Sequence, residues 1–270
     1  MPLRSDFTNC RNDDTSAPES VPTVTVALGG RYMRVHGRAP VVLLNNSKTR
    51  GRITGYTYAS RRRLMHLLHQ IDREATAYLP LFITLTYPSI YPATALETKR
   101  HLDSFCKRLL RRYKDVCIIW KLEYQHRGAP HYHLLVFGVP YLPRDEIAQA
   151  WYKVVGSDDT RHRQAGTRVE RIASWNGVIS YAAKYLGKVV QATGDISPGR
   201  FWGVYGRRNL PIRLLVRVIS WQSFYWLRRR LWRRAKGLSI ATGRRGHYAG
   251  IIQFIGATGA IALLNGAVKT

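Results

Sequence analysis

The chain has 270 residues, with 43 Lys and Arg against 16 Asp and Glu and a formal net charge of +27. Its hydrophobic content of 45% is that of a globular protein, and this length can bury one core with small additions. This excess of positive charge predicts a polyanionic partner, either nucleic acid or an anionic membrane surface. The phosphate-binding pattern GxxxxGK followed by Ser or Thr is absent, which excludes an ATPase or helicase of that type.

Residues 1–22 are polar and lack the apolar core of a secretory signal, so a disordered tail is expected there. The three cysteines, Cys10, Cys106 and Cys117, show no CxxC spacing. They therefore predict neither a zinc knuckle nor a disulfide framework, and they favour a reducing compartment.

Residues 23–60 contain short strand-like runs at 24–28 and 41–44, separated by glycines and surrounded by arginines. They form either a small basic β appendage or a loop. Ser60 then caps a predicted helix with one apolar side. That side consists of Leu64, Leu67, Leu68 and Ile71.

Three arginines, Arg61, Arg62 and Arg63, stand at the expected start of this helix, where cations oppose the helix dipole. Either the helix begins later, or phosphate groups hold these arginines, or the charge run is only solvated. The sequence leaves these alternatives open.

Strands and helices alternate in the middle of the chain. The predicted strands are 81–86, 116–124, 131–137 and 167–172, the last at a sheet edge. Helices are predicted after the capping box Thr94-x-x-Glu97, from Pro143, and after Ser174, with a polar loop at 156–166. The order β-α-β-β-α-β-α predicts an α+β fold, an antiparallel sheet with helices on one face and the site on the open face.

Two strands joined by a turn carry a candidate metal site. His131 and His133 point to the same face, because side chains alternate along a strand. If Glu123 lies opposite His131, its carboxylate joins the two imidazoles. Such a set can hold a divalent cation with open positions for a substrate oxygen. The alternative is that the two histidines are merely half-buried polar residues.

The helix after Ser174 carries a candidate nucleophile. Tyr181 and Tyr185 are four residues apart on it, so their phenols share a face, and Lys184 lies near that face. A phenol has a pKa of about 10 and needs a nearby cation and a polarised electrophile to react at neutral pH. The alternative is that both tyrosines pack in a core.

Three motifs in order carry a family resemblance: the core strand motif 82–88, the metal motif 131–133 and the nucleophile motif 181–185. Over residues 79–203 the chain resembles the HUH superfamily of rolling-circle replication initiators. It is most similar to the two-tyrosine type of single-stranded DNA phages and their prophage relatives. The run 199–203 also resembles phage initiators.

The resemblance implies an endonuclease domain at 61–205 that nicks and rejoins DNA through a 5′-phosphotyrosine. Mg²⁺ or Mn²⁺ would sit on His131, His133 and Glu123. Tyr181 would attack, Lys184 would steady the phosphate charge, and Tyr185 would cut on the next round. The implied partners are single-stranded origin DNA and the host helicase and polymerase, in the cytoplasm of a bacterial cell.

Residues 206–245 form a basic, mostly helical extension rich in aromatic residues, and no acidic residue follows Asp195. Arginines with interleaved rings are typical of single-strand binding. A helix at 219–236 with solvated arginines would also explain the pattern, and both can hold. The predicted nucleic-acid contacts are Arg61, Arg62, Arg63, Arg200, Arg207, Arg208, Arg228, Arg229, Arg230 and Trp226.

Residues 246–270 form an apolar tail. The stretch 249–268 has no charge and is long enough to span a bilayer, but Gln253, Asn265 and internal glycines favour a frayed or packed tail. Three further functions stay open beside the nickase. They are a single-tyrosine relaxase or transposase of the same superfamily, a non-catalytic basic protein that binds single-stranded nucleic acid, and a membrane-associated basic protein.

Overall fold

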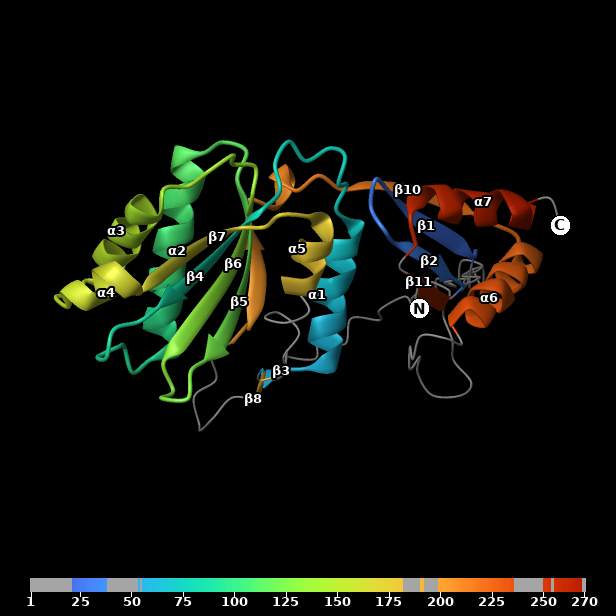
Figure 1. The fold of residues 1–270 in the computed structure, drawn as a ribbon. Coiled ribbons are helices and arrows are strands. Elements are labelled where there is room, and N and C mark those ends of the chain that lie inside the picture. Colours follow the sequence, from blue (N-terminus) through green and yellow to red (C-terminus); the bar gives the residue numbers. More distant parts are fainter. Residues whose placement is uncertain are drawn as a thin grey trace, which may run out of the picture.

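The computed structural model describes residues 21–37, 53, 55–181, 190–191, 199–235, 250–253 and 255–268. These residues form a five-stranded and a four-stranded antiparallel sheet with helices packed on both (Figure 1). A two-stranded pair, β3 (Gly55–Tyr56) with β8 (Val190–Gln191), forms a third hydrogen-bonded sheet among the described residues. The α+β class expected from the sequence is confirmed.

The central sheet has the strand order β7-β4-β6-β5-β9. Its strands are β4 (Leu81–Thr86), β5 (Cys117–Tyr124), β6 (Pro130–Phe137), β7 (Thr167–Arg171) and β9 (Trp202–Tyr205). Four of them match the predicted strands, and β7 is at an edge as expected. The fifth, β9, was not predicted, because it is only four residues long and pairs with a strand far away in the sequence.

One face of this sheet is covered by α2 (Ala95–Arg112) and α3 (Arg144–Val155) (Figure 1). Thr94 caps α2, since its hydroxyl accepts the backbone N–H of Glu97 at 3.3 Å. Phe105 of α2 and Trp151 of α3 meet edge to face, with ring centroids 5.8 Å apart. The predicted polar loop 156–166 contains a short helix, α4 (Thr160–Ala165), which Asp159 caps.

The other face is partly covered by α1 (Tyr58–Gln70) and α5 (Trp175–Tyr181) (Figure 1). Trp175 of α5 stacks on Phe137 of β6, with ring centroids 6.4 Å apart. The prediction that Ser60 caps α1 is wrong: Thr57 is the cap and accepts the backbone N–H of Ser60 at 3.2 Å. The arginines at 61–63 therefore lie beyond the first three helical residues, where the dipole penalty is small.

A second unit combines strands from the N-terminal and the C-terminal parts of the chain. Its sheet has the order β10-β1-β2-β11 and carries its own apolar core. The segments expected to be an appendage, a basic extension and an apolar tail thus share one sheet. The elements are β1 (Thr23–Leu28), β2 (Met33–His36), β10 (Arg213–Val218), α6 (Trp221–Ala235), β11 (Gly250–Gln253) and α7 (Ala257–Val268), after the 3-10 turn η2 (Arg207–Asn209).

Some sequence predictions fall outside the described residues. These are most of the N-terminal tail, the run 41–44, and the second half of the tyrosine helix from 182 onward. In the part of the apolar tail that is described, α7 is 12 residues long. No helix within the described residues is long and apolar enough to cross a membrane.

Asp72 connects the two units. It is fully buried, its carboxylate accepts the backbone N–H groups of Glu74 and Ala75, and it pairs with Arg213 at the start of β10. Gly29, between β1 and β2, approaches this carboxylate so closely that a Cβ there would overlap it, and its φ is +71°. Only glycine fits both conditions. The backbone N–H of Arg31 donates to the carbonyl of His69 at 2.8 Å and holds the loop 29–32 against the end of α1.

Candidate metal and nucleophile site on the central sheet

The register of the hairpin β5–β6 brings the candidate metal ligands together. Glu123 is directly opposite His131, and Lys121 is directly opposite His133. On the other side of β6, Thr86 and Thr84 of β4 lie opposite the same two histidines. The predicted pairing of Glu123 with His131 is therefore confirmed, and all six side chains share one face of the sheet.

The two imidazoles are held by hydroxyl groups on one side and meet a carboxylate on the other. Nδ1 of His131 lies 3.1 Å from the hydroxyl of Thr86, and Nδ1 of His133 lies 3.3 Å from that of Thr84. Nε2 of His133 lies 3.1 Å from Oε2 of Glu123. The two rings are 4.7 Å apart and nearly perpendicular. The threonines thus fix both ring orientations and leave Nε2 as the atom that faces a ligand.

Lys121 is a site residue that the sequence analysis missed. Its side chain is fully buried, and its ammonium lies 2.6 Å from Oε1 of Glu123. The same ammonium lies 5.1 Å from the ring centre of Tyr56, which precedes α1. The signal was present in the sequence: a lysine two residues before Glu123 in an apolar strand must share the face of Glu123.

Burial and charge shift the pKa values of this cluster. Burial acts to raise the pKa of Glu123, but hydrogen bonds and charge from His133 and Lys121 outweigh it and lower the pKa to about 2. Burial also lowers the pKa of His131 to about 4, and His133 and Arg127 act in the same direction against Glu123. At neutral pH Glu123 is thus a carboxylate and His131 a neutral imidazole, the states in which both bind cations.

The donor types suit a hard or borderline divalent cation, since imidazole and carboxylate together are typical ligands for such ions. Within the described ranges, however, no three His, Cys, Asp or Glu side chains converge as a ready-made metal site. The observed contact between His133 and Glu123 joins two of the three predicted donors. The other oxygen of Glu123 is engaged by Lys121.

Thr86 at the end of β4 is anchored from the opposite side. Its carbonyl accepts the indole N–H of Trp151 at 2.8 Å and the Nε2–H of His162 at 2.9 Å. Its own N–H donates to the carbonyl of Gly166 at 2.8 Å. Helices α3 and α4 therefore position the strand end that orients His131.

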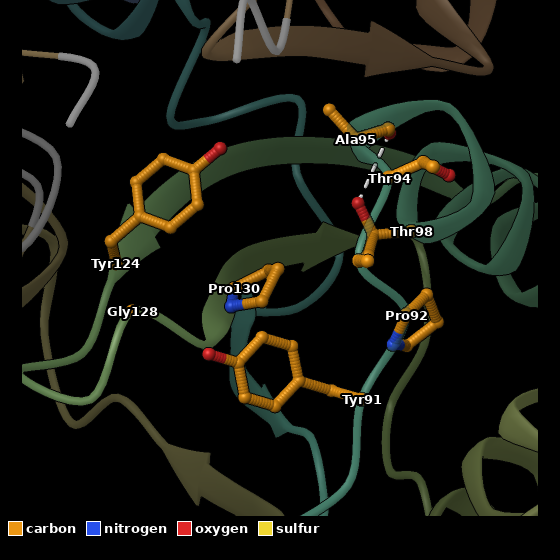
Figure 2. Close-up of a pocket in the computed structure, with 9 residues that line it drawn as sticks. Tyr91, Pro92, Thr94, Ala95, Thr98, Tyr124, Gly128 and Pro130 are labelled. Atoms are coloured by element: carbon orange, nitrogen blue, oxygen red, sulfur yellow. Dashed lines mark hydrogen bonds between the residues drawn. The ribbon is translucent and has the colours of Figure 1, made fainter. Parts of the chain in front are cut away.

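The turn of the hairpin is braced by Arg127. Its guanidinium donates to the carbonyls of Tyr87 at 2.6 Å and Pro88 at 2.7 Å. The hydroxyl of Tyr91 donates to the carbonyl of Arg127 at 2.8 Å. Beside this brace is a pocket of about 460 Å³ at the start of α2, which Tyr91, Tyr124 and Pro130 help to line (Figure 2).

The nucleophile helix lies over the same face as the histidines. Ser174 caps α5, as predicted, because its hydroxyl accepts the N–H of Gly177 at 3.1 Å. The stack of Trp175 on Phe137 fixes the helix over β6. Tyr181 is the last residue of α5 whose backbone is described, while Lys184 and Tyr185 lie outside the described residues.

The predicted nucleic-acid contacts fall into two groups. Arg63, Arg200 and Arg207 line one groove between α1 and β9. Arg228, Arg229 and Arg230 lie on α6 in the second unit. The two groups are on different units of the fold. Arg61, Arg62 and Arg208 do not line that groove.

The predicted stacking residue on α6 is packed. Trp226 contacts the second core, and a Cβ on Gly266 of α7 would lie 3.4 Å from its ring. Arg230 covers the ring, with its guanidinium 5.8 Å from the ring centre. Among the α6 side chains that the structure describes, the exposed rings are instead Trp221 and Tyr225, which are 41% and 51% exposed. The sequence did not show which rings of α6 are exposed, because that depends on which side of the helix packs in the core.

Comparison with known proteins shows that part of the chain is similar to replication proteins. Residues 80–190 match the family described as Replication-associated protein ORF2/G2P, and this span contains all predicted metal and nucleophile residues. A candidate replication protein of Xylella fastidiosa strain Temecula1 is 27% identical over 201 residues, 69% of this chain and 72% of that protein. A similar protein of strain 9a5c is 26% identical over 198 residues, 69% of this chain and 65% of that protein. No solved structure matches the chain.

Proposed function

We propose that this protein initiates rolling-circle replication by nicking and rejoining single-stranded origin DNA through a 5′-phosphotyrosine intermediate. The observation that carries the proposal is the pairing of Glu123 with His131 across the hairpin, on the face over which α5 leads to Tyr181. The match to replication-associated proteins over 80–190 supports it, because the match contains the hairpin and the whole nucleophile motif.

His131, His133 and Glu123 would hold a divalent cation, Mg²⁺ or Mn²⁺. When bound, such an ion polarises the scissile phosphate and offsets charge on the departing oxygen. Thr86 and Thr84 keep Nε2 of each imidazole turned to the ligand side. Lys121 keeps Glu123 charged and aligned, and the contact of Glu123 with His133 already brings together two of the three residues that would hold the ion.

In the nicking step the phenol oxygen of Tyr181 attacks the phosphorus in line. A bond forms between that oxygen and phosphorus, the bond to the 3′ oxygen breaks, and the phenol proton is given up. The 3′ oxygen gains a proton and becomes a free 3′ hydroxyl that a host polymerase can extend. Lys184 would steady charge on the phosphate. The reverse reaction rejoins the strand without a nucleotide cofactor, because the phosphotyrosine conserves the bond energy.

Tyr185 is proposed as a second nucleophile that cuts when one round of synthesis is complete. It would act while Tyr181 still holds the 5′ end. If Tyr185 is only a core residue, the chemistry is that of a single-tyrosine enzyme.

The test is to incubate the protein with Mn²⁺ and labelled single-stranded oligonucleotides tiled across the replicon that encodes it. A covalent protein–DNA adduct on a denaturing gel is expected for one oligonucleotide. It should be absent with a chelator and absent for the variant His131→Ala, His133→Ala. Adduct formation by that double variant without metal would overturn the assignment of the hairpin.

One observation favours a second candidate, a non-catalytic protein that binds single-stranded nucleic acid. The ammonium of Lys121 already neutralises Glu123, as in a purely structural ion pair. Tight binding to the tiled oligonucleotides with no adduct under any divalent metal would support this function over the first.

A further inference from the structure

A groove with a volume of about 820 Å³ opens between the start of α1 and strand β9. Three arginines from separate segments line it: Arg63 of α1, Arg200 before β9 and Arg207 after β9. Among the described residues that line the groove, none is acidic. Elsewhere in the described part of the chain, acidic side chains pair with other cations, and no ion pair of these three arginines is found. Their charge is therefore directed at solvent or at an anionic ligand.

The groove also contains an immobilised aromatic ring. The indole N–H of Trp202 donates to the hydroxyl of Ser60 at 2.8 Å, which ties β9 to the first turn of α1. Gly203 follows Trp202 and has no room for a side chain, since a Cβ there would lie 2.9 Å from Trp120 on the opposite sheet face. A ring held in place beside guanidinium groups is the arrangement that binds stacked bases and phosphates of single strands.

The groove adjoins the metal and nucleophile site. Trp202 is directly opposite Lys121 in the sheet, and Lys121 contacts Glu123. Strand β9 lies next to β5, which lies next to β6, so Trp202 and the histidines are two strand spacings apart, about 10 Å. A strand whose scissile phosphate rests at the histidines would therefore reach the groove with a neighbouring nucleotide.

We propose that this groove binds the single-stranded DNA next to the scissile phosphate. Arg63, Arg200 and Arg207 contact its phosphates, and Trp202 stacks on one of its bases. The position of the scissile phosphate is taken from the proposed function. The binding of single-stranded DNA to the groove does not depend on that function. A duplex would gain the phosphate contacts alone, because its bases are already stacked.

The test measures binding in a chelator, where no cleavage occurs, so its outcome is independent of the nicking activity. The triple variant Arg63→Gln, Arg200→Gln, Arg207→Gln is compared with Arg100→Gln, Arg108→Gln, Arg111→Gln, which removes the same charge from α2 on the opposite face. Affinity for a labelled single strand is measured over a range of salt concentrations. The slope of log K against log salt should decrease by about 2 for the groove variant, since each lost contact to a single strand removes about 0.7. The control should change it little.

A second variant tests the stacking. Trp202→Leu should weaken single-strand binding about tenfold and duplex binding much less, and Trp202→Phe should restore most of the loss. Circular dichroism of each variant verifies the fold. Equal slopes for the groove and control variants, or an equal loss of duplex and single-strand binding in Trp202→Leu, would overturn the proposal. Intact groove binding with no cleavage in metal would instead overturn the nicking function alone.

Discussion

The ammonium of Lys121 lies 2.6 Å from the carboxylate of Glu123, and no part of the Lys121 side chain is exposed. A buried charge that loses its partner is costly, so Lys121→Met should lower the free energy of unfolding by about 3 kcal/mol. Mn²⁺ should recover part of this loss, because a cation can replace the missing charge beside Glu123. Denaturant unfolding with and without Mn²⁺ measures both effects. Lys121→Arg, which keeps the charge, serves as the control. A Lys121→Met protein as stable as the parent without metal would show that the pair does not stabilise the fold.

The contact of Thr86 with His131 predicts an effect on metal binding. Thr86→Val keeps the shape of the side chain and removes the hydroxyl at Nδ1 of His131. Loss of such an orienting partner typically weakens metal affinity about tenfold to a hundredfold. Titration with Mn²⁺ followed by electron paramagnetic resonance measures the affinity, and Thr86→Ser should restore it. Unchanged affinity in Thr86→Val would remove His131 from the proposed metal site.

His69, near the end of α1 where the two units meet, should make the stability of the fold sensitive to acid. Burial, together with Arg73, Arg31 and His66, lowers the pKa of His69 from 6.5 to about 4. The folded protein thus binds a proton less readily at His69 than the unfolded chain does. Between pH 6.5 and pH 4 protonation therefore favours unfolding, and stability should fall with falling pH by about 1–2 kcal/mol from this residue. Denaturant unfolding at pH 7 and pH 4.5 tests this, with His69→Gln expected to reduce the difference. A pH dependence unaffected by His69→Gln would contradict it.

Much of the central sheet could be predicted from local patterns. Strand alternation gave the shared face of His131 and His133, whereas the register that places Glu123 opposite His131 was a supposition that the structure confirms. Threonines at 84 and 86 carried a further signal, because they alternate with the same period as the two histidines. Their pairing with β6 depends on the order of strands in the sheet, which local alternation does not give.

Strand pairings between distant parts of the chain are the main feature of the fold that could not be predicted from the sequence. Strand β1 pairs with β10, nearly 190 residues later, so the two chain ends share a sheet that no local pattern indicates. The buried lysine at 121 shows a second limit. A charged residue in an apolar strand is usually read as solvent-exposed, and in the structure the carboxylate of Glu123 and the ring of Tyr56 accompany the burial of Lys121.

For the proposed nicking function, a variant of Tyr185 distinguishes a two-tyrosine from a one-tyrosine enzyme. Tyr185→Phe keeps the packing volume and removes only the hydroxyl. It should permit a first cut through Tyr181 and should impair the second cut that releases a finished circle. A replication assay that separates circles from longer products measures this. Normal circle release by Tyr185→Phe would assign Tyr185 to the core.

The most direct test of the account is to locate the bond between protein and DNA. The protein is incubated with Mn²⁺ and the cleaved oligonucleotide, digested with protease, and analysed by mass spectrometry. The account predicts a 5′-phosphate on the peptide that contains Tyr181, absent in Tyr181→Phe and in the His131→Ala, His133→Ala variant. A phosphate linkage at another residue, or cleavage that leaves no linked peptide, would contradict it.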